Sequence, residues 1–437
     1  MARQGARAPL NVFLNARLAG RLSRQASGAV SFQYDPGWLD WEHALPISIS
    51  LPLREDRYAG APVIAVLDNL LPDPEPVRRR IAERVGVTGH DAYSLLAGLG
   101  RDCAGALQIL PEGQDPGPTG TIGGRAMDDG EIRTMIRNLA TAPLGLDDDA
   151  GFRISLAGVQ EKTALLHWQD KWHIPHGTTP TTHILKPRIG MLPDGIDPGE
   201  SVENEYLCLR LTGALGLPSA TARLIEFDGE CVLAVERFDR QWTGDGRLLR
   251  LPQEDCCQAL SVPPSIKYET DGGPGVTAIL DLLQGSDEPM NDRRMFLKAQ
   301  IVFWLLGATD GHAKNFSIFL RPGGRFRMTP LYDVMSLQPA VDKSRLRKNR
   351  FRLALAAGDN RHYTIDTIFP RHFTQTALKA GMPAGTVREI CDELLDRTEP
   401  AIQAVLDSLP PRFPSELADS VVGGMTSRLR RLGHAIG

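Results

Sequence analysis

The stretch Gly307-Ala-Thr-Asp-Gly-His-Ala-Lys-Asn315 does most to decide how this chain folds. The residues before it, Met295 to Leu306, are apolar nearly all round, which predicts a buried helix. Gly307 is suited to end that helix, because glycine tolerates the left-handed backbone of a helix C-terminus. The polar loop that follows is therefore expected to stand on a rigid, buried support, as reactive side chains commonly do.

A β-hairpin is predicted directly after this loop. Residues 316–320 and 325–331 have the pattern of two strands joined by the loop Arg321-Pro-Gly-Gly324. If residue 320 pairs with residue 325, residue 312 comes opposite residue 333. Neighbouring strands lie about 4.8 Å apart, so the hairpin is expected to return Asp333 to the loop.

The spacing within the loop indicates phosphoryl-transfer chemistry. Asp310 and Asn315 are five positions apart, like the Asp and Asn of the kinase catalytic loop, where the Asp orients the acceptor hydroxyl and the Asn binds Mg²⁺. Asn315 and Asp333 could give oxygen ligands to one Mg²⁺. Val334 and Met335 stand where D-F-G has Phe and Gly, so that switch is not assumed. The alternative is an Asx-type turn without chemistry.

Two upstream segments fit the same interpretation less specifically. Lys186, which ends the strand His183-Ile-Leu-Lys186, resembles the phosphate-binding strand lysine of kinases, and a surface lysine is the alternative. Glu205, on the next helix, is its candidate partner, against a solvated glutamate. The segment Arg153 to Lys162 has one glycine, Gly158, and matches neither Gly-rich phosphate motif. There a plain hairpin turn is preferred to an anion-binding turn.

Composition points to an ordinary globular protein inside the cell. The chain has 437 residues, 42% hydrophobic and 23% charged, which suggests two or three domains. The net charge of -4 excludes a globally basic nucleic-acid coat. Six scattered cysteines without a C-x-x-C pair indicate neither a disulfide scaffold nor a zinc site, and Cys256 and Cys257 are expected in the core. We expect no signal peptide and no membrane span.

The chain is expected to divide near residue 150, after Asp147-Asp148-Asp149. Residues 1–150 would form a small α/β unit, and 151–437 a larger domain with strands to residue 240 and a mainly helical remainder. The expected strands are 30–34, 153–156, 163–168, 172–175, 183–186, 222–227 and 231–237. The expected helices are 77–85, one around Ile132 to Leu139, 202–215, 276–284, 292–306, 371–380, 384–395, 399–408 and 415–432. This order predicts a two-lobed α+β fold.

At these residues the chain closely resembles the HipA family of bacterial toxin kinases. The resemblance spans most of the chain and rests on segments at 67–73, 98–102, 153–163, 179–186, 235–240, 251–255, 267–269, 271–275 and 307–315. They read LDNLLPD, GLGRD, RISLAGVQEKT, TPTTHILK, VERFDR, LPQED, KYE, DGGPG and GATDGHAKN. The combination is highly specific.

The resemblance implies a kinase-like fold related to lipid kinases, whose loop D-x-H-x-x-N fits Asp310-Gly-His312. It implies ATP and Mg²⁺ as ligands and a set of site residues with stated roles. Asp310 would be catalytic; Asn315 and Asp333 would bind metal; Lys186, His312, Glu236 and Phe238 would bind ATP, the last two at the adenine. Ala157, Gly158, Val159 and Gln160 would form the phosphate loop. Ser155, which by itself reads as a strand residue, would be an inactivating autophosphorylation site.

The resemblance also implies partners and a cellular role. A serine/threonine-protein kinase of this family would phosphorylate an aminoacyl-tRNA synthetase, typically the glutamyl enzyme, and cause growth arrest and persistence. A HipB-like helix-turn-helix antitoxin would neutralise it and carry it to operator DNA as a corepressor, in the cytoplasm and at the nucleoid. A small-molecule kinase and a degenerate kinase that only binds antitoxin and DNA are the alternatives. The basic run from Lys343 to Arg352 could contact operator phosphates, dock a substrate or be a solvated loop.

Overall fold

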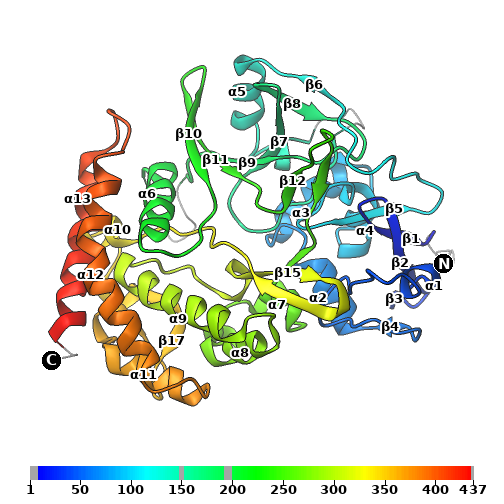
Figure 1. Cartoon of the computed structure of the whole chain (residues 1–437). Coiled ribbons are helices and arrows are strands. Elements are labelled where there is room, and N and C mark those ends of the chain that lie inside the picture. Colours follow the sequence, from blue (N-terminus) through cyan, green and yellow to red (C-terminus); the bar gives the residue numbers. More distant parts are fainter. Residues whose placement is uncertain (1–7, 147–151, 191–198, 435–437) are drawn as a thin grey trace. The chain divides into compact units, whose positions relative to one another are not determined.

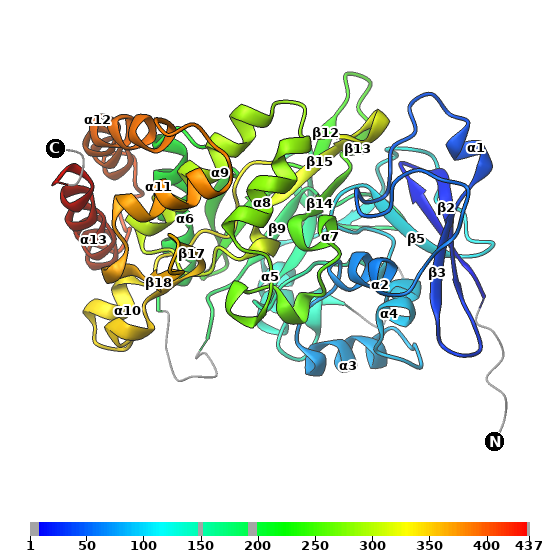
Figure 2. The ribbon, with the colours of Figure 1, turned by 90° about the horizontal axis from the view of Figure 1, so that it is seen from below.

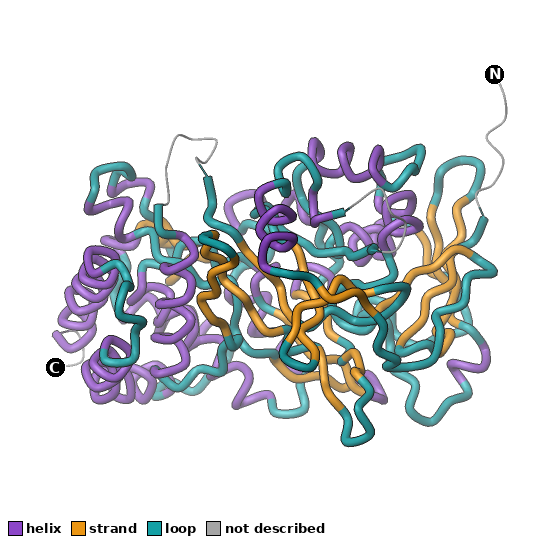
Figure 3. The backbone as a smooth tube through the Cα atoms, turned by 90° about the horizontal axis from the view of Figure 1, so that it is seen from above, coloured by secondary structure: helices purple, strands orange, loops and turns teal. Residues whose placement is uncertain are grey.

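The computed structural model describes residues 8–146, 152–190 and 199–434. The chain forms two compact units: Met1–Pro187 with Ile225–Ser265 and Ile318–Phe326, and Arg188–Leu224 with Ile266–Ser317 and Arg327–Gly437. Strands gather in the first unit and helices in the second (Figures 1 and 3), which confirms the α+β class. The boundary expected at Asp147 to Asp149 lies outside the described residues, so the division into 1–150 and 151–437 stays a prediction.

The N-terminal part of the first unit is a five-stranded antiparallel sheet in the order β4-β3-β2-β1-β5. Its strands are β1 (Leu10–Leu14), β2 (Arg17–Arg24), β3 (Val30–Tyr34), β4 (Tyr58–Ala59) and β5 (Leu107–Pro111). The accompanying helices are α1 (Pro36–Leu39), α2 (Ala61–Asp68), α3 (Glu75–Arg84) and α4 (Ala92–Leu99). The predicted strand at 30–34 coincides with β3, and the predicted helix at 77–85 overlaps α3, so both predictions are confirmed.

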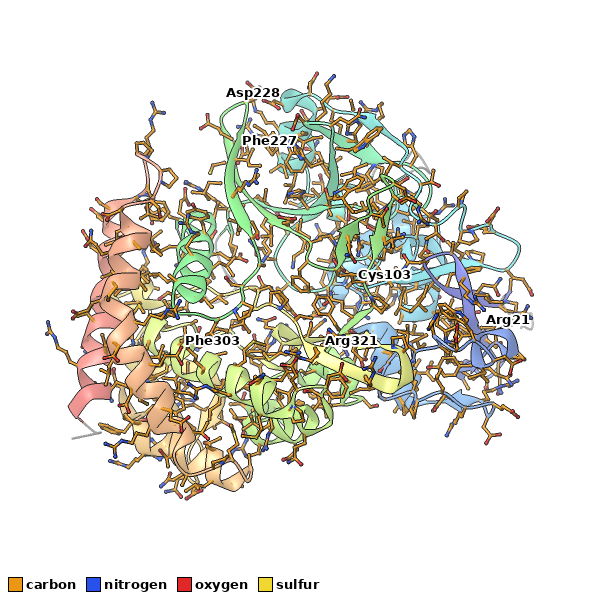
Figure 4. The ribbon with its side chains drawn as sticks, in the orientation of Figure 1. Arg21, Cys103, Phe227, Asp228, Phe303 and Arg321 are labelled. Carbon is orange, nitrogen blue, oxygen red and sulfur yellow. The ribbon has the colours of Figure 1, made fainter. Side chains whose placement is uncertain are left out.

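The second sheet of this unit has six strands in the order β10-β11-β9-β7-β8-β6. They are β6 (Gly124–Ala126), β7 (Thr163–Trp168), β8 (Lys171–Pro175), β9 (His183–Lys186), β10 (Ala222–Phe227) and β11 (Glu230–Glu236). Helix α5 (Asp129–Arg137) covers it, with Ile132 and Ile136 in one cluster with Leu165 and Phe227. Phe227 and Asp228 mark the β10–β11 turn in Figure 4.

Residues 153–156 do not form the strand that the sequence predicted. The segment from Phe152 to Ala157 has no regular structure. Ser155 donates its N–H to the Asp102 carbonyl at 2.9 Å and its hydroxyl to the Leu70 carbonyl at 2.7 Å. Its polar groups are therefore satisfied by distant loops and not by a neighbouring strand, while Ile154 is buried. Alternating apolar residues here reflect burial without a β-ladder.

A buried ionic cluster lies beside β11. Asp102 accepts from the guanidinium groups of Arg237, Arg240 and Arg250 at 3.3, 2.8 and 2.9 Å. Asp239 accepts from Arg237 at 2.8 Å. Burial raises the pKa of Asp102, but the three arginine charges outweigh it and hold the pKa below its usual value. The cluster fixes the chain directly after Glu236.

Short elements complete the first unit. They are β12 (Arg240–Trp242), β13 (Leu248–Arg250), β14 (Gln253–Asp255) and α7 (Cys256–Ala259). The hairpin of β15 (Ser317–Arg321) and β16 (Arg325–Met328) joins β14 in a three-stranded sheet, as the predicted hairpin required. All six cysteines are free thiols; Cys256 and Cys257 are buried, and Cys103 is labelled in Figure 4.

The second unit is mainly helical, as expected. Its helices are α6 (Ser201–Ala214), α8 (Val276–Leu282), α9 (Pro289–Leu306), α10 (Gln338–Asp342), α11 (Pro370–Lys379), α12 (Thr386–Leu406) and α13 (Ser415–His434). A small hairpin of β17 (Arg352–Ala357) and β18 (His362–Thr364) is added. Helices α12 and α13 lie side by side in both ribbon views (Figures 1 and 2).

One helix prediction was wrong. The sequence predicted separate helices at 384–395 and 399–408, but α12 runs through Pro400 without a break. An interior proline costs about 3 kcal/mol, yet Leu394, Thr398, Ala401 and Val405 keep one buried face across it. Packing of that face outweighs the lost hydrogen bond. Among the described residues, no helix is both long and apolar enough to cross a membrane.

Candidate active site

Helix α9 supports the candidate catalytic loop as the sequence predicted. Phe296, Ile301 and Trp304 are fully buried along it. Gly307 ends the helix with φ 70°, a left-handed backbone. A Cβ there would come within 2.6 Å of the Phe351 ring, so this position requires glycine for backbone and space alike. The start of the loop is fixed by the core.

The loop from Ala308 to Phe316 is held by its own backbone. The Asn315 side chain donates from Nδ2 to the Asp310 carbonyl at 2.7 Å, and the His312 N–H donates to the same oxygen at 2.8 Å. Beneath the loop, Phe303 (labelled in Figure 4) stacks on Phe316 with ring centroids 5.7 Å apart. Since Nδ2 is occupied, the Oδ1 of Asn315 is oriented as the acceptor atom of this side chain.

The hairpin returns the chain to this loop. The Thr329 N–H donates to the Ser317 carbonyl at 2.9 Å, within one residue of the expected register. The Tyr332 hydroxyl donates to the Lys314 carbonyl at 2.9 Å. Asp333 follows with φ 58°, a backbone that a non-glycine residue adopts at a cost and commonly at functional sites. The hairpin therefore delivers Asp333 beside the residues that the sequence grouped with it.

His312 is influenced by the charges of both acidic groups. Its ring is buried and 3.9 Å from the carboxylate of Asp310. Burial lowers the pKa of His312; Asp310 and Asp333 act against this shift and Lys267 adds to it. All three charges are thus close enough to act on the ring, and at neutral pH we expect a neutral imidazole. Its Nδ1 is buried without a hydrogen-bond partner among the described residues.

Tyr268 is a site residue to which sequence reasoning gave no role. Its hydroxyl donates to Oδ1 of Asp310 at 2.5 Å. Its ring meets His312 edge-on, with centroids 4.8 Å apart. The neighbouring Lys267 is buried, with Nζ 5.5 Å from the Tyr268 ring centroid. The only sequence signal was the KYE segment within the family resemblance, because no spacing rule links positions 42 residues apart.

The predicted nucleotide residues of the first unit lie on β9 and β11. Lys186 is buried at the end of β9 and pairs with Leu233, while Glu236 pairs with His183 at the other end. Phe238 follows β11, and its ring is 5.8 Å from that of Phe319. Two neighbouring strands thus place a cation at one end of their pairing and Glu236 at the other.

The segment predicted to cover phosphate is held by contacts on both sides of Gly158. Gly158 has φ 106° and bridges to Pro72, and Lys162 donates from Nζ to the Ala157 carbonyl at 2.9 Å. Gln160 donates from Nε2 to the Pro187 carbonyl at 3.2 Å, which ties the segment to the residue after Lys186. Val159 is 62% exposed. The segment is thus a turn at Gly158 with the ammonium group of Lys162 bound to the carbonyl before it.

These residues suit a nucleotide and its metal. Mg²⁺ prefers oxygen ligands and a few protein groups beside phosphate, and the amide oxygen of Asn315 and the carboxylate of Asp333 are of this kind. The partnerless Nδ1 of His312 is a polar atom for which a phosphate oxygen or water would be a partner. Lys186 and the turn at 157–160 belong to one unit, and Asp310, His312, Asn315 and Asp333 to the other. Glu205 is buried on α6 of the second unit, and its pairing with Lys186 stays a prediction.

Comparisons with known proteins agree across the chain. The HipA-like C-terminal domain matches residues 154–402 and the HipA N-terminal domain residues 10–110. The Sinorhizobium fredii protein Y4mE, whose name calls it a kinase, is 35% identical over 95% of this chain and 97% of its own. The serine/threonine-protein kinase toxin HipA of Shewanella oneidensis is 28% identical over 91% of this chain and 89% of its own.

A solved structure supports the same assignment. The structure of Shewanella oneidensis HipA with HipB and operator DNA aligns with a TM-score of 0.81 at 26% identity, over 97% of both chains. The kinase-like fold expected from the sequence is thus confirmed. The chain therefore belongs to the HipA family of toxin kinases.

Proposed function

We propose that this chain is an ATP-dependent serine/threonine-protein kinase that transfers the γ-phosphoryl group to a hydroxyl of another protein. The observation that carries the proposal is the loop at 310–315, fixed on a buried helix, with Asp333 returned beside it by a hairpin. This is the order and spacing of a catalytic loop and its metal-binding Asp in kinases. The family and its relatives' names support the same reaction.

In this proposal Asp310 receives the acceptor. Its carboxylate accepts a hydrogen bond from the acceptor hydroxyl and takes the proton as the hydroxyl oxygen bonds to the γ-phosphorus. The bond from that phosphorus to the β–γ bridging oxygen breaks, and ADP leaves. A general base of this kind contributes about 10²- to 10⁴-fold to the rate.

The remaining residues bind the nucleotide. Asn315 and Asp333 would hold Mg²⁺, which offsets negative charge on the phosphate oxygens when bound. Lys186 and His312 would contact phosphate, and the turn at Ala157, Gly158, Val159 and Gln160 would cover it. Glu236 and Phe238 would hold the adenine, supported by the buried cluster that fixes the chain after β11.

Ser155 is proposed as an autophosphorylation site that switches the kinase off. Its side chain is fully buried and donates to the Leu70 carbonyl. A dianionic phosphate cannot be buried there without a large cost in free energy. Phosphorylation would therefore require the segment at 153–160 to leave its place, which would remove the turn beside Lys186.

The proposed antitoxin follows from a relative, and the proposed target follows from the family resemblance. A helix-turn-helix antitoxin of the HipB kind would bind the chain and take it to operator DNA, because the related Shewanella oneidensis protein is seen in such a complex. The proposed target is an aminoacyl-tRNA synthetase, typically the glutamyl enzyme, whose phosphorylation would arrest growth and favour persistence. The chain would act in the cytoplasm, and at the nucleoid within the antitoxin complex.

The test uses labelled ATP. The purified chain is incubated with Mg²⁺, [γ-³²P]ATP and a cell extract, and the labelled protein is identified. We expect label on a synthetase and on Ser155, and none with an Asp310→Ala variant that still folds and binds antitoxin. Full transfer by that variant would refute the assignment of Asp310.

A further inference from the structure

The carboxylate of Asp310 is held on one side only. Its side chain is 59% exposed, so solvent alone would let it rotate. Oδ1 receives the hydroxyl of Tyr268 at 2.5 Å. No other hydrogen bond reaches this carboxylate from the part of the chain that the structure describes, so Oδ2 receives none from those residues. A hydrogen bond to an ionised group is among the stronger ones that a protein makes.

The turn that carries Tyr268 is rigid. Tyr268 precedes a short helical turn, Glu269–Asp271, and its carbonyl accepts from the Gly273 N–H at 2.9 Å. A Cβ on Gly273 would come within 2.1 Å of the Ile266 carbonyl oxygen, so the two ends of the turn are packed together. The position of the tyrosine is therefore set by backbone contacts and not by chance rotation.

A second anchor attaches this turn to β17 within the same unit. The carboxylate of Glu269 accepts from the Ala356 N–H on β17 at 2.6 Å. The same carboxylate lies 3.4 Å from the guanidinium of Arg361. Meanwhile the Tyr268 ring packs edge-on against His312, which is itself buried. The hydroxyl thus reaches Asp310 from a ring that packs against His312, on a turn that Glu269 anchors to β17.

We propose that Tyr268 is a positioning residue for Asp310. Its hydroxyl fixes Oδ1 and thereby presents Oδ2 to the acceptor hydroxyl in a single orientation. Tyr268 does not take part in proton transfer, since its own proton already serves the bond to Oδ1. The proposal rests on the proposed function, in which Asp310 orients the acceptor. The orientation of the acceptor hydroxyl would then depend on Tyr268, a residue far from Asp310 in the sequence.

The structure distinguishes this role from simple packing. The aromatic carbons of Tyr268 pack on His312, whereas the hydroxyl alone makes the hydrogen bond that positions Asp310. Tyr268→Phe keeps the first and removes the second. The hydroxyl is bonded to the carboxylate of Asp310, which receives the acceptor in the proposed function and does not bind ATP. Its loss should therefore slow transfer without weakening ATP binding.

The experiment measures the phosphoryl-transfer rate of the full-length chain against ATP concentration in the presence of Mg²⁺. For Tyr268→Phe we expect a kcat about 10- to 100-fold below wild type, the effect of losing one hydrogen bond to a charged group. The KM for ATP and the Tm should stay near those of wild type. The matched control is Tyr363→Phe, which removes a hydroxyl hydrogen-bonded to Arg361 near the same turn but not to Asp310. It should transfer at the wild-type rate.

Two results would overturn the inference while the proposed function stands. One is an active wild type with a Tyr268→Phe variant of the same kcat. The other is a Tyr268→Phe variant whose ATP affinity or Tm falls in parallel with its rate, which would show a structural role. A wild-type chain that transfers no phosphate to any protein would instead overturn the proposed function, and the inference with it.

Discussion

Replacing Asp102 by Asn tests how the first unit is held together beside the proposed adenine site. Asp102 is 2% exposed and is surrounded by the guanidinium groups of Arg237, Arg240 and Arg250. Its Oδ2 also accepts from the backbone N–H and the hydroxyl of Thr181 at 3.0 and 2.8 Å. Asn has the same shape but no charge, and its amide nitrogen cannot accept.

The expected loss in the free energy of unfolding follows from the groups that the substitution leaves without a partner. Three buried cations would face Asp239 as their remaining counter-charge within the cluster. Whichever way the new amide turns, its NH₂ group meets donors that previously found an acceptor. Removing one partner of a buried ion pair costs about 3–5 kcal/mol, and we expect a loss of this size in the free energy of unfolding. Because Arg237 lies between Glu236 and Phe238, ATP affinity should fall as well.

The assay is urea unfolding at pH 7, followed by tryptophan fluorescence. Asp91→Asn is the control, because Asp91 pairs with Arg24 at 3.1 Å while 43% exposed, and an exposed pair contributes about 1 kcal/mol or less. The folded state depresses the pKa of Asp102, so its stabilisation is present above the unfolded pKa of about 3.9 and is lost below it. The gap between wild type and Asp102→Asn should therefore narrow as the pH falls below about 4. An Asp102→Asn variant within 1 kcal/mol of wild type at pH 7 would show that the charge of Asp102 does not hold this cluster together.

Three further changes test other parts of the structure. Gly307→Ala should cost about 2–4 kcal/mol through strain and a clash with Phe351, against about 1 kcal/mol for Gly323→Ala, which has φ 77° and open space around it; equal Tm losses would contradict this. Burial raises the pKa of Glu254 to about 8, so the folded state binds the carboxyl proton more tightly than the unfolded state does. The stability of the wild type should therefore fall between about pH 5 and pH 8. In thermal scans Glu254→Gln should flatten that fall. Arg347, Lys348 and Arg350 are exposed. If the chain binds operator DNA with an antitoxin as proposed, replacing all three by Gln should lower the salt dependence of that binding by about 0.9 in log–log slope per lost phosphate contact. An unchanged slope would identify the run as a solvated loop.

Much of the candidate site was predictable because its parts are close in sequence. Apolar residues all round α9, a glycine at its end and a Pro-Gly-Gly turn in the hairpin are local signals, and they placed Asp333 near Asp310 and Asn315 correctly. Strands β7 and β9 were predicted with the bounds that the structure shows, because apolar runs there coincide with true ladder partners.

The failures share a different cause. At Ser155 the hydrogen-bond partners come from residues 70 and 102, so an apolar alternation that predicted a strand indicates only burial. At Pro400 the buried face of α12 overrides a local helix breaker. Tyr268 reaches Asp310 through a turn whose position is set by contacts to β17. In each case tertiary contacts determine the local structure, and these contacts cannot be predicted from a pattern along the chain.

The proposed metal site is tested by measuring how Mg²⁺ changes the affinity of the chain for a non-hydrolysable ATP analogue. If Asn315 and Asp333 hold the metal beside the phosphates, Mg²⁺ should tighten binding to wild type at least about 10-fold, a difference of about 1.4 kcal/mol. Asp333→Asn should lose most of that gain while keeping its fold. Binding that is indifferent to Mg²⁺ in wild type, or equally Mg²⁺-dependent in the variant, would show that Asn315 and Asp333 do not hold the metal.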